Sequence, residues 1–194
     1  MRSNLTIVLM IAAAVTSACT SGADAANDTA AVAPASVDAP AAPAALDDPT
    51  IVAILDATNT ADVETGELAV QRGSTKEVRD FGAMLARDHA AVRQQGRDLA
   101  QKLGVTPTPP ADDASVKAHA DAMTMLRSKS GAEFDRAFLA HEVAFHRGVL
   151  DAMEGTLLPA IRNAEVRDLV VKIAPAFRAH MMAAESLGRK ITPQ

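Results

Sequence analysis

The chain has 194 residues and a formal net charge of −5; 48% of its residues are apolar, only 3% are aromatic, and it contains neither Trp nor Tyr. Lys and Arg are interleaved with Asp and Glu, which excludes the basic face that a nucleic-acid partner requires. The length favours one folded domain, and the abundance of Ala, Leu, Val and Met favours packed helices over a β-sandwich. We therefore expect an all-α domain. It has no internal disulfide, because Cys19 is its one cysteine.

The first 18 residues have the pattern of an export signal. Arg2 precedes an apolar run over residues 5–15, which is too short for a membrane-spanning helix of about 20 residues. The tetrapeptide Thr16-Ser17-Ala18-Cys19 resembles a bacterial lipobox, although Thr16 stands where such signals usually have Leu. This pattern predicts that Cys19 is lipidated after residues 1–18 are removed. The alternative is plain cleavage after Ala18, which leaves a soluble periplasmic protein with a free thiol.

Residues 19–48 consist mainly of Ala, Pro, Asp, Ser and Thr, with almost no large apolar side chain. Such a segment cannot bury enough surface to offset the entropy lost on ordering. We expect a disordered tether between a lipid anchor and a folded domain over residues 49–190. The expected location is the periplasm, with the lipid anchor in the outer membrane as the membrane partner. Protein partners are not indicated.

Two long helices are predicted at the start of the folded domain. The first follows Pro49 and ends at Gly73. The second begins at once with Ser74 and Glu77, which have the S-x-x-E spacing of a capping box. It ends at Gly104, ahead of a proline-rich loop. Their apolar stripes contain Ile51, Leu55, Thr58, Asp62, Thr65 and Ala69 in the first and Val78, Phe81, Leu85, His89, Val92, Leu99 and Leu103 in the second.

A short connector helix over about residues 112–128 leads to two further long helices. The third begins with Ser130 and Glu133, in a second S-x-x-E box. The fourth follows a predicted cap at Asn163 and contains Pro175, which can bend it. Their stripes are Leu139, Val143, His146, Leu150 and Met153 in the third, and Val166, Leu169, Ile173, Phe177, His180, Ala184 and Leu187 in the fourth.

Four helices with one apolar stripe each bury those stripes by packing as a four-helix bundle. The stripes place one polar side chain on each helix: Asp62, His89, His146 and His180. At about 1.5 Å per residue, their distances from the nearest turns put all four near mid-height. We therefore expect them to meet in the core.

Several motifs of the folded region resemble those of a bacterial envelope family, the domain of unknown function 4142. They are A-D-V-E-T-G-E-L-A, M-L-A-R-D-H, G-A-E-F-D-R-A-F-L followed by His146, and A-P-A-F-R-A-H. The resemblance implies a ferritin-like four-helix bundle in the cell envelope and no established reaction. This chain has Asp62 where we expect Glu in the first motif, which shortens the reach of that carboxylate across the core.

A di-iron centre of the ferritin type is not expected, because Ala86 and Val143 stand where its Glu-x-x-His motifs need Glu. A single ion of zinc, iron or copper suits a ligand set of Asp62, His89, His146 and His180. In this hypothesis Asp88 orients a histidine from behind, and Glu142 is a further outer group or a fifth ligand. The alternative is a hydrogen-bonded core network of Asp62 and the three histidines without metal, in a structural or interaction module of the envelope, with Asp62 or Asp88 accepting from imidazole nitrogens. For Asp88 and Glu142, the alternative to a role at the metal is solvation at the stripe edge.

Other candidate residues carry weaker patterns. We interpret His119 and His141 as structural or exposed. Met181 and Met182, together with Met84 and Met153, would suit copper(I), but methionine at helical spacing more commonly fills a core. The sequence has no Ser or Cys nucleophile beside a base and no glycine-rich phosphate loop, so an enzymatic function is not predicted.

The lipidation hypothesis predicts that Cys19→Ala releases the mature protein from the membrane. The several acyl chains of a bacterial lipoprotein anchor a protein firmly, whereas a polar tether has no affinity for lipid. Fractionation of cells expressing the wild type and the variant measures this. An unchanged membrane fraction in the variant would mean that something other than Cys19 anchors the protein.

Overall fold

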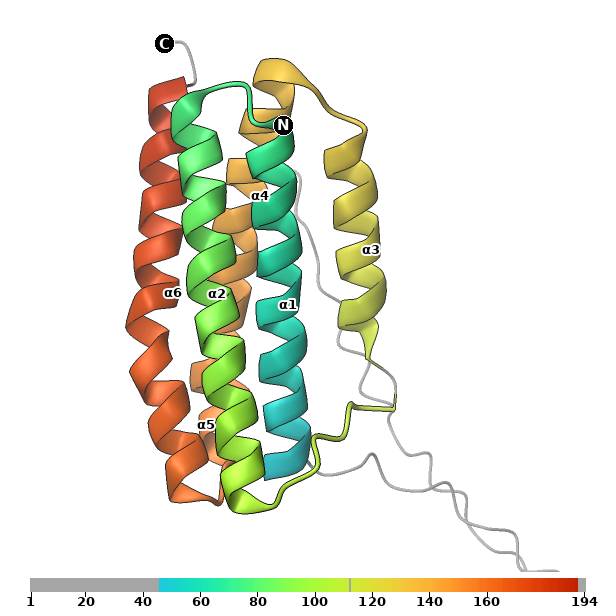
Figure 1. Cartoon of the computed structure of the whole chain (residues 1–194), viewed down its shortest axis with the longest axis vertical. Helices are drawn as coiled ribbons and strands as arrows, with labels where there is room; N and C mark the ends of the chain where they lie inside the picture. Colours follow the sequence, from blue (N-terminus) through green and yellow to red (C-terminus); the bar gives the residue numbers. More distant parts are fainter. Residues whose placement is uncertain (1–45, 112, 192–194) are drawn as a thin grey trace, which may run out of the picture. The chain divides into compact units, whose positions relative to one another are not determined.

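The computed structural model describes residues 46–111 and 113–191, and all of them belong to one compact unit (Figure 1). The predicted export signal, Cys19 and the tether up to residue 45 lie outside the described residues. The elements are α1 (Asp48–Arg72), α2 (Lys76–Leu103), α3 (Ala114–Arg127), α4 (Gly131–Ala152), a π-helical turn η1 (Met153–Leu157), α5 (Leu158–Ala160) and α6 (Ala164–Ile191). No strand occurs among these residues, and none of their helices is long and apolar enough to cross a membrane.

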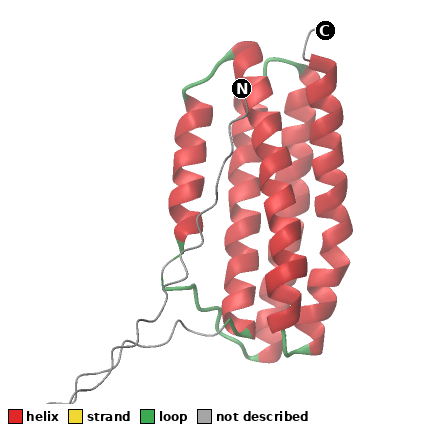
Figure 2. Ribbon diagram, turned by 180° about the vertical axis from the view of Figure 1, so that it is seen from behind, coloured by secondary structure: helices red, strands yellow, loops and turns green. Residues whose placement is uncertain are grey.

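The predicted four-helix bundle is confirmed. Helix α1 packs along α2, and α4 packs along α6, with further contacts between α2 and α6 and between α1 and α4. Figure 1 shows α1 and α6 running in one direction and α2 and α4 in the other, so a long crossover must join α2 to α4. The predicted connector helix, α3, forms part of this crossover and lies outside the bundle against α4 (Figures 1 and 2).

Some helix ends agree with the sequence prediction. Gly73 and Gly104 end α1 and α2, and Gly104 adopts φ 65°, a left-handed conformation that glycine reaches without strain. The side chain of Asn163 accepts hydrogen bonds from the amides of Glu165 and Val166, which makes it the predicted cap of α6. Helix α1 begins at Asp48, one residue before the expected boundary, because the Asp47 side chain accepts from the Thr50 amide at 2.9 Å.

Both predicted capping boxes are wrong. Thr75, one residue after Ser74, caps α2 by accepting from the Val78 amide. Ser130 does precede α4, but its side chain makes no capping bond. Ser74 is unavailable as a cap because a buried carboxylate from another helix binds it: Asp135 accepts from the Ser74 amide at 2.8 Å, the Ser74 hydroxyl at 2.6 Å and the Thr75 amide at 3.2 Å. The tertiary hydrogen bonds to Asp135 thus take the place of the local capping bond predicted for Ser74.

A second carboxylate, Asp48, binds the backbone of a turn at the opposite end of the bundle. Asp48 accepts from the amides of Arg162 and Asn163, each at 2.9 Å. These amides precede α6 and have no partner inside a helix. Asp48 therefore fastens the start of α1 to the turn before α6, as Asp135 fastens α4 to the turn between α1 and α2.

The buried core is divided into two apolar clusters. The first contains Ile51, Val52, Leu55, Ala100, Leu150, Met153, Leu157, Ile161, Val166, Leu169, Val170, Ile173 and Phe177. The second contains Leu68, Ala69, Val78, Phe81, Leu85, Met123, Leu126, Phe134, Phe138, Leu139 and Ala184. On each bundle helix, buried polar residues lie between the parts that belong to the two clusters: Asn59, Asp62, Thr65, His89, Glu142, His146 and His180. A polar layer thus crosses the middle of the bundle.

Helices α1 and α2 touch through glycines beside this layer. A Cβ on Gly66 would lie 2.6 Å from the carbonyl oxygen of Gly82, and a Cβ on Gly82 would lie 2.6 Å from the carbonyl oxygen of Gly66. Because both obstacles are backbone atoms, a larger residue could be accommodated only by moving the helices apart. Gly66 lies one turn after Asp62, so the contact also sets how closely α1 approaches the polar layer.

We predict that Gly66→Ala and Gly82→Ala each lower the free energy of unfolding by about 1–3 kcal/mol, because they overpack the contact. Gly96→Ala is the matched control, since Gly96 lies in α2 like Gly82 and a Cβ on it meets nothing within 4 Å. It should raise stability by up to about 1 kcal/mol through helix propensity. Urea unfolding of the three variants tests this, and equal effects at the three positions would contradict it.

Candidate metal centre

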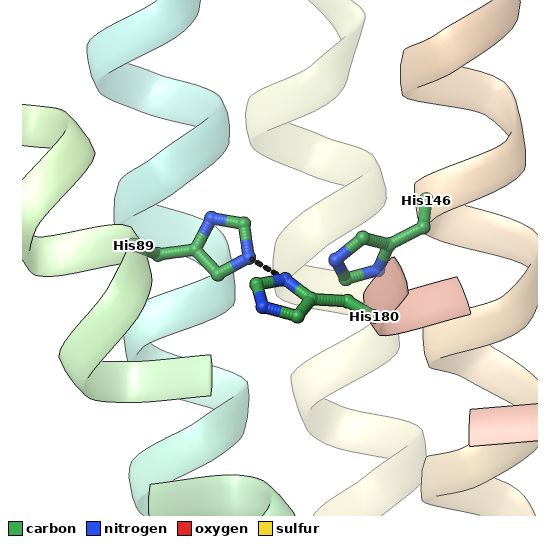
Figure 3. Close-up of side chains that lie close together, drawn as sticks. All are labelled: His89, His146 and His180. Atoms are coloured by element: carbon green, nitrogen blue, oxygen red, sulfur yellow. Dashed lines mark hydrogen bonds between the residues drawn. The ribbon is translucent and has the colours of Figure 1, made fainter. Parts of the chain in front are cut away.

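Three histidine rings meet at the centre of the polar layer. They come from α2, α4 and α6, and Figure 3 shows His89, His146 and His180 converging. Their exposed fractions are only 1%, 0% and 5%. One nitrogen of each ring lies within 4.8 Å of a nitrogen of each other ring. The Phe177 ring contacts two of them, with centroids 4.9 Å from His89 and 5.4 Å from His146, and closes the site on the side of the first apolar cluster.

Each ring has one nitrogen that contacts an oxygen acceptor. We call this the outer nitrogen of the ring and the other one the inner nitrogen. His89 Nδ1 lies 2.7 Å from Asn59 Oδ1, and the Asn59 amide nitrogen already donates to the Leu55 carbonyl, which leaves its oxygen to face the ring. His146 Nδ1 lies 3.0 Å from the Glu142 carbonyl oxygen. His180 Nε2 lies 3.2 Å from Asp88 Oδ2. Because each partner accepts, each of these outer nitrogens must carry the proton and donate.

The inner nitrogens are then left without protons. His89 Nε2 and His180 Nδ1 lie 3.1 Å apart (Figure 3), and His146 Nε2 is buried without a hydrogen-bond partner. Three lone pairs therefore point into one small space. Nitrogens bound to one tetrahedral ion at 2.0–2.1 Å would lie about 3.3 Å apart. The separation of His89 Nε2 and His180 Nδ1 is 3.1 Å, and the His146 nitrogen lies within 4.8 Å of both. The residues present thus fit a metal ion held by three imidazoles.

A proton count separates this arrangement from a closed hydrogen-bond network. Three contacts link four side chains in a row: Asn59 with His89, His89 with His180, and His180 with Asp88. A hydrogen bond at each of these contacts needs one proton. Two neutral rings carry two protons. Burial lowers the pKa of His89 to about 2 and also lowers the pKa of His180, so neither ring holds a third. The contact between the two rings is the one left without a proton.

Carboxyl groups lie behind all three rings. The distances from the outer nitrogens are 3.4 Å for His89 to Asp62, 3.5 Å for His146 to Glu142 and 3.2 Å for His180 to Asp88. Carboxylates at this position orient histidine ligands and strengthen their bond to a metal. Two of the carboxyls, Asp62 and Glu142, are fully buried. None of their four oxygens has a partner at hydrogen-bond distance and angle.

The protonation of these two carboxyls reflects their surroundings. Burial raises the pKa of Asp62 well above its usual range, and the adjacent Glu142 carboxyl adds to the rise. Burial also raises the pKa of Glu142 to about 7. Both shifts arise because buried negative charge without a counter-charge is unfavourable.

The structure brings the predicted site residues together, but Asp62 is not grouped with all three histidines. His89, His146 and His180 form one group, while Asp62 lies in a second group with Glu142 and His146. Glu142 is not solvated at the edge of its stripe, because it is fully buried. Asp88 is half-buried and is paired with Arg87 as well as with His180.

The remaining candidates lie elsewhere. His119 bonds Glu64 at 2.8 Å, and both His119 and His141 line a pocket of about 510 Å³ between α1, α3 and α4. Met153 and Met181 belong to the first apolar cluster, Met84 packs against the second, and Met182 is 59% exposed. These methionines pack as core or surface residues.

Comparison with known proteins gives the family of the chain. The model of a domain of unknown function (DUF4142) matches residues 33–187. The chain belongs to this family. No curated protein matches it.

Two solved structures resemble the DUF4142 chain in fold. One is a DUF305 fragment from Deinococcus radiodurans, with a TM-score of 0.64 and 16% identity over 73% of this chain and 95% of that one. The other is CopM in its Cu(II)-bound form, with a TM-score of 0.58 and 14% identity over 75% of this chain and 98% of that one. Both likenesses support the helical-bundle fold of the DUF4142 domain.

Sequence reasoning missed one buried residue of the site in the DUF4142 domain. Asn59 is fully buried and orients His89, whereas Thr58, which was assigned to the stripe of α1, is only half-buried and lines the pocket beside α3. The signal was present, since Asn59 follows Leu55 by four residues and precedes Asp62 by three. Because Thr58 and Asn59 are adjacent and both polar, the sequence pattern did not indicate that Asn59 is the one that faces the core.

The buried histidines of the DUF4142 domain should make its metal-free form sensitive to acid. The folded-state pKa of His89 lies below the unfolded value of about 6.5, so the unfolded chain binds a proton first and stability falls as pH drops through 6.5. Between pH 7.5 and 5.5, this ring should cost about 1.4 kcal/mol. His89→Gln should therefore lose about that much less than the wild type, since effects of the other groups cancel in the difference. Urea unfolding with chelator at both pH values measures it, and equal losses would show that His89 is not buried as a neutral ring.

Proposed function

We propose that this domain binds one transition-metal ion through His89 Nε2, His146 Nε2 and His180 Nδ1. The observation that carries the proposal is that an oxygen acceptor lies at the outer nitrogen of every ring, which assigns the ring protons to that side. All three outer nitrogens face oxygen acceptors, and the inner nitrogens of three separate helices share one space. In such a site the ion would supply the positive charge that three converging lone pairs require.

The chemistry of the donors limits the ion. Imidazole nitrogens suit zinc, copper and iron, and three of them leave a further coordination position for water or another ligand. The fold is shared with CopM, which is described in a Cu(II)-bound form, so a bundle of this kind holds copper in at least one other protein. This likeness supports a metal-binding role and does not select copper for this chain.

A metal-free network with a purely structural role is the competing function. It would require every buried polar atom to be satisfied by another, because each unsatisfied one costs about 1–3 kcal/mol. His146 Nε2 lacks a partner, and the contact between His89 and His180 lacks a proton. A bound ion removes the deficit at the three nitrogens.

We also propose that the domain works in the cell envelope, held to the outer membrane by lipidated Cys19. The export pattern of residues 1–18 and the polar composition of residues 19–48 support this location. A metal-binding domain placed there would meet ions that enter the periplasm.

The proposal predicts one metal ion per chain in protein purified without chelator or histidine tag. Adding the ion at about 100 times its dissociation constant should stabilise the folded state by about 2.7 kcal/mol and raise the melting temperature. Replacing His89, His146 or His180 with Ala should lower the affinity at least about 100-fold. Isothermal titration and thermal unfolding measure these effects.

His119→Ala is the control, because His119 lies on α3 and pairs with Glu64 outside the three-histidine group. It should keep the stoichiometry and affinity of the wild type. Substoichiometric metal in every preparation, with no change in melting temperature on adding zinc, copper or iron, would favour the metal-free network instead.

A further inference from the structure

The walls of the three-histidine site differ in how close they lie to solvent. Asp88, which contacts the outer nitrogen of His180, has a side chain that is 35% exposed. The residues that contact the outer nitrogens of the other two rings, Asn59 and Glu142, are each 0% exposed. An ion that reaches the inner nitrogens has to pass one of these walls. The wall behind His180 is the one that water contacts.

Two polar contacts cross the interface between α2 and α6 on this side of the bundle. His180 Nε2 donates to Asp88 Oδ2 at 3.2 Å. Lys172 Nζ donates to Gln95 Oε1 at 2.9 Å. The two helices run in opposite directions (Figure 1), and each spans about two turns between its two contact residues. The contacts are therefore separated along the interface by about two helical turns.

Small side chains occupy the stretch between these two contacts. Ala91 lies on α2 between Asp88 and Gln95, and it is exposed. Ala176 lies on α6 one turn before His180, and it is exposed as well. Because alanine has no side chain beyond Cβ, these two positions leave space at the surface of the interface next to the His180 ring.

A pocket approaches the site from the other side of α2, but its inner wall is harder to pass. It has a volume of about 270 Å³, lies between α1 and α2, and reaches Asn59. The Asn59 amide donates to the Leu55 carbonyl at 2.7 Å, and the Asn59 oxygen lies 2.7 Å from His89 Nδ1. An ion on this path would break both of these buried contacts. The His180 ring would give up only its bond to half-buried Asp88, which water can replace, because its contact with His89 has no proton.

We propose that metal ions enter and leave the three-histidine site between α2 and α6, past the ring of His180. This inference rests on the proposed function and adds the route by which the site is filled and emptied. His180 is the ligand that moves as an ion passes, whereas His89 and His146 stay fixed by their buried partners. Ala91 and Ala176 border the path, although neither side chain can bind a metal.

A residue that only borders the path acts on rates alone. Enlarging it raises the barrier that an ion crosses in both directions, so association and dissociation slow by the same factor and the dissociation constant is unchanged. A residue that positions a ligand acts on the bound state, and its replacement changes the dissociation constant. The two rate constants therefore separate the path from the site.

Ala176→Leu and Ala91→Leu test the route from either helix. Both positions are exposed, so the larger side chain can extend along the surface without entering the core. We expect each variant to slow the association and the dissociation of zinc(II) by about 10-fold, with a dissociation constant within about 2-fold of the wild-type value. Circular dichroism and urea unfolding check that both variants are folded.

The rate constants are measured by stopped flow with the whole chain and zinc(II). Since the chain contains neither Trp nor Tyr, a chromophoric chelator supplies the signal. Mixing zinc-loaded protein with excess chelator gives the dissociation rate constant. Mixing metal-free protein with zinc(II) and adding the chelator after set delays gives the association rate constant.

Two exposed alanines at other walls are the matched controls. Ala179 lies on α6, like Ala176, but lines a hollow beside η1. Ala57 lies on α1 and lines the pocket that reaches Asn59. Ala179→Leu and Ala57→Leu should leave both rate constants unchanged.

Three results would overturn the route while leaving the metal site in place. The first is unchanged rate constants in both Ala176→Leu and Ala91→Leu. The second is slower exchange in a control variant than in these two. The third is a changed dissociation constant in both of them, because they would then act on the site itself. A wild-type chain that binds no zinc, copper or iron ion would instead overturn the proposed function.

Discussion

The convergence of three buried imidazoles is the constraint on which the rest of the molecule depends. Each ring is held by a hydrogen bond at its outer nitrogen, and the inner nitrogens of His89, His146 and His180 share a space with no proton between them. An arrangement of this kind is costly in a metal-free core, at about 1–3 kcal/mol for each unsatisfied group. It persists only if the helices that carry it are fixed by other contacts.

Those contacts lie at the two ends of the bundle and at one glycine pair. The two apolar clusters hold the helices above and below the polar layer, and Asp48 and Asp135 each bind the turn at one end. The contact between Gly66 and Gly82 brings α1 against α2, which places Asn59 and its oxygen 2.7 Å from His89. The contacts at the two ends and at the glycine pair therefore fix the helices, so the middle of the bundle can hold polar groups that are not all paired.

The fold was predictable because its signals are repeated. Every bundle helix has an apolar stripe that spans several turns, and four such helices have few ways to bury their stripes. The histidines were predictable for the same reason, since each occupies a stripe position at similar height. The capping boxes failed because they were inferred from two residues each, and a distant carboxylate, Asp135, took over Ser74.

The sequence by itself determined the helices, the bundle and the meeting of three histidines at mid-height, because helical periodicity and distance along the chain fix which residues face inward and at what level. Only the tertiary structure decided the roles within that layer. It placed Asp62 beside Glu142 rather than among the rings, buried Glu142 completely, and brought Asn59 to His89. These outcomes depend on how far each helix is rotated about its axis and how closely it approaches its neighbours. Side-chain packing across the core sets both quantities, and no periodicity within one helix encodes them.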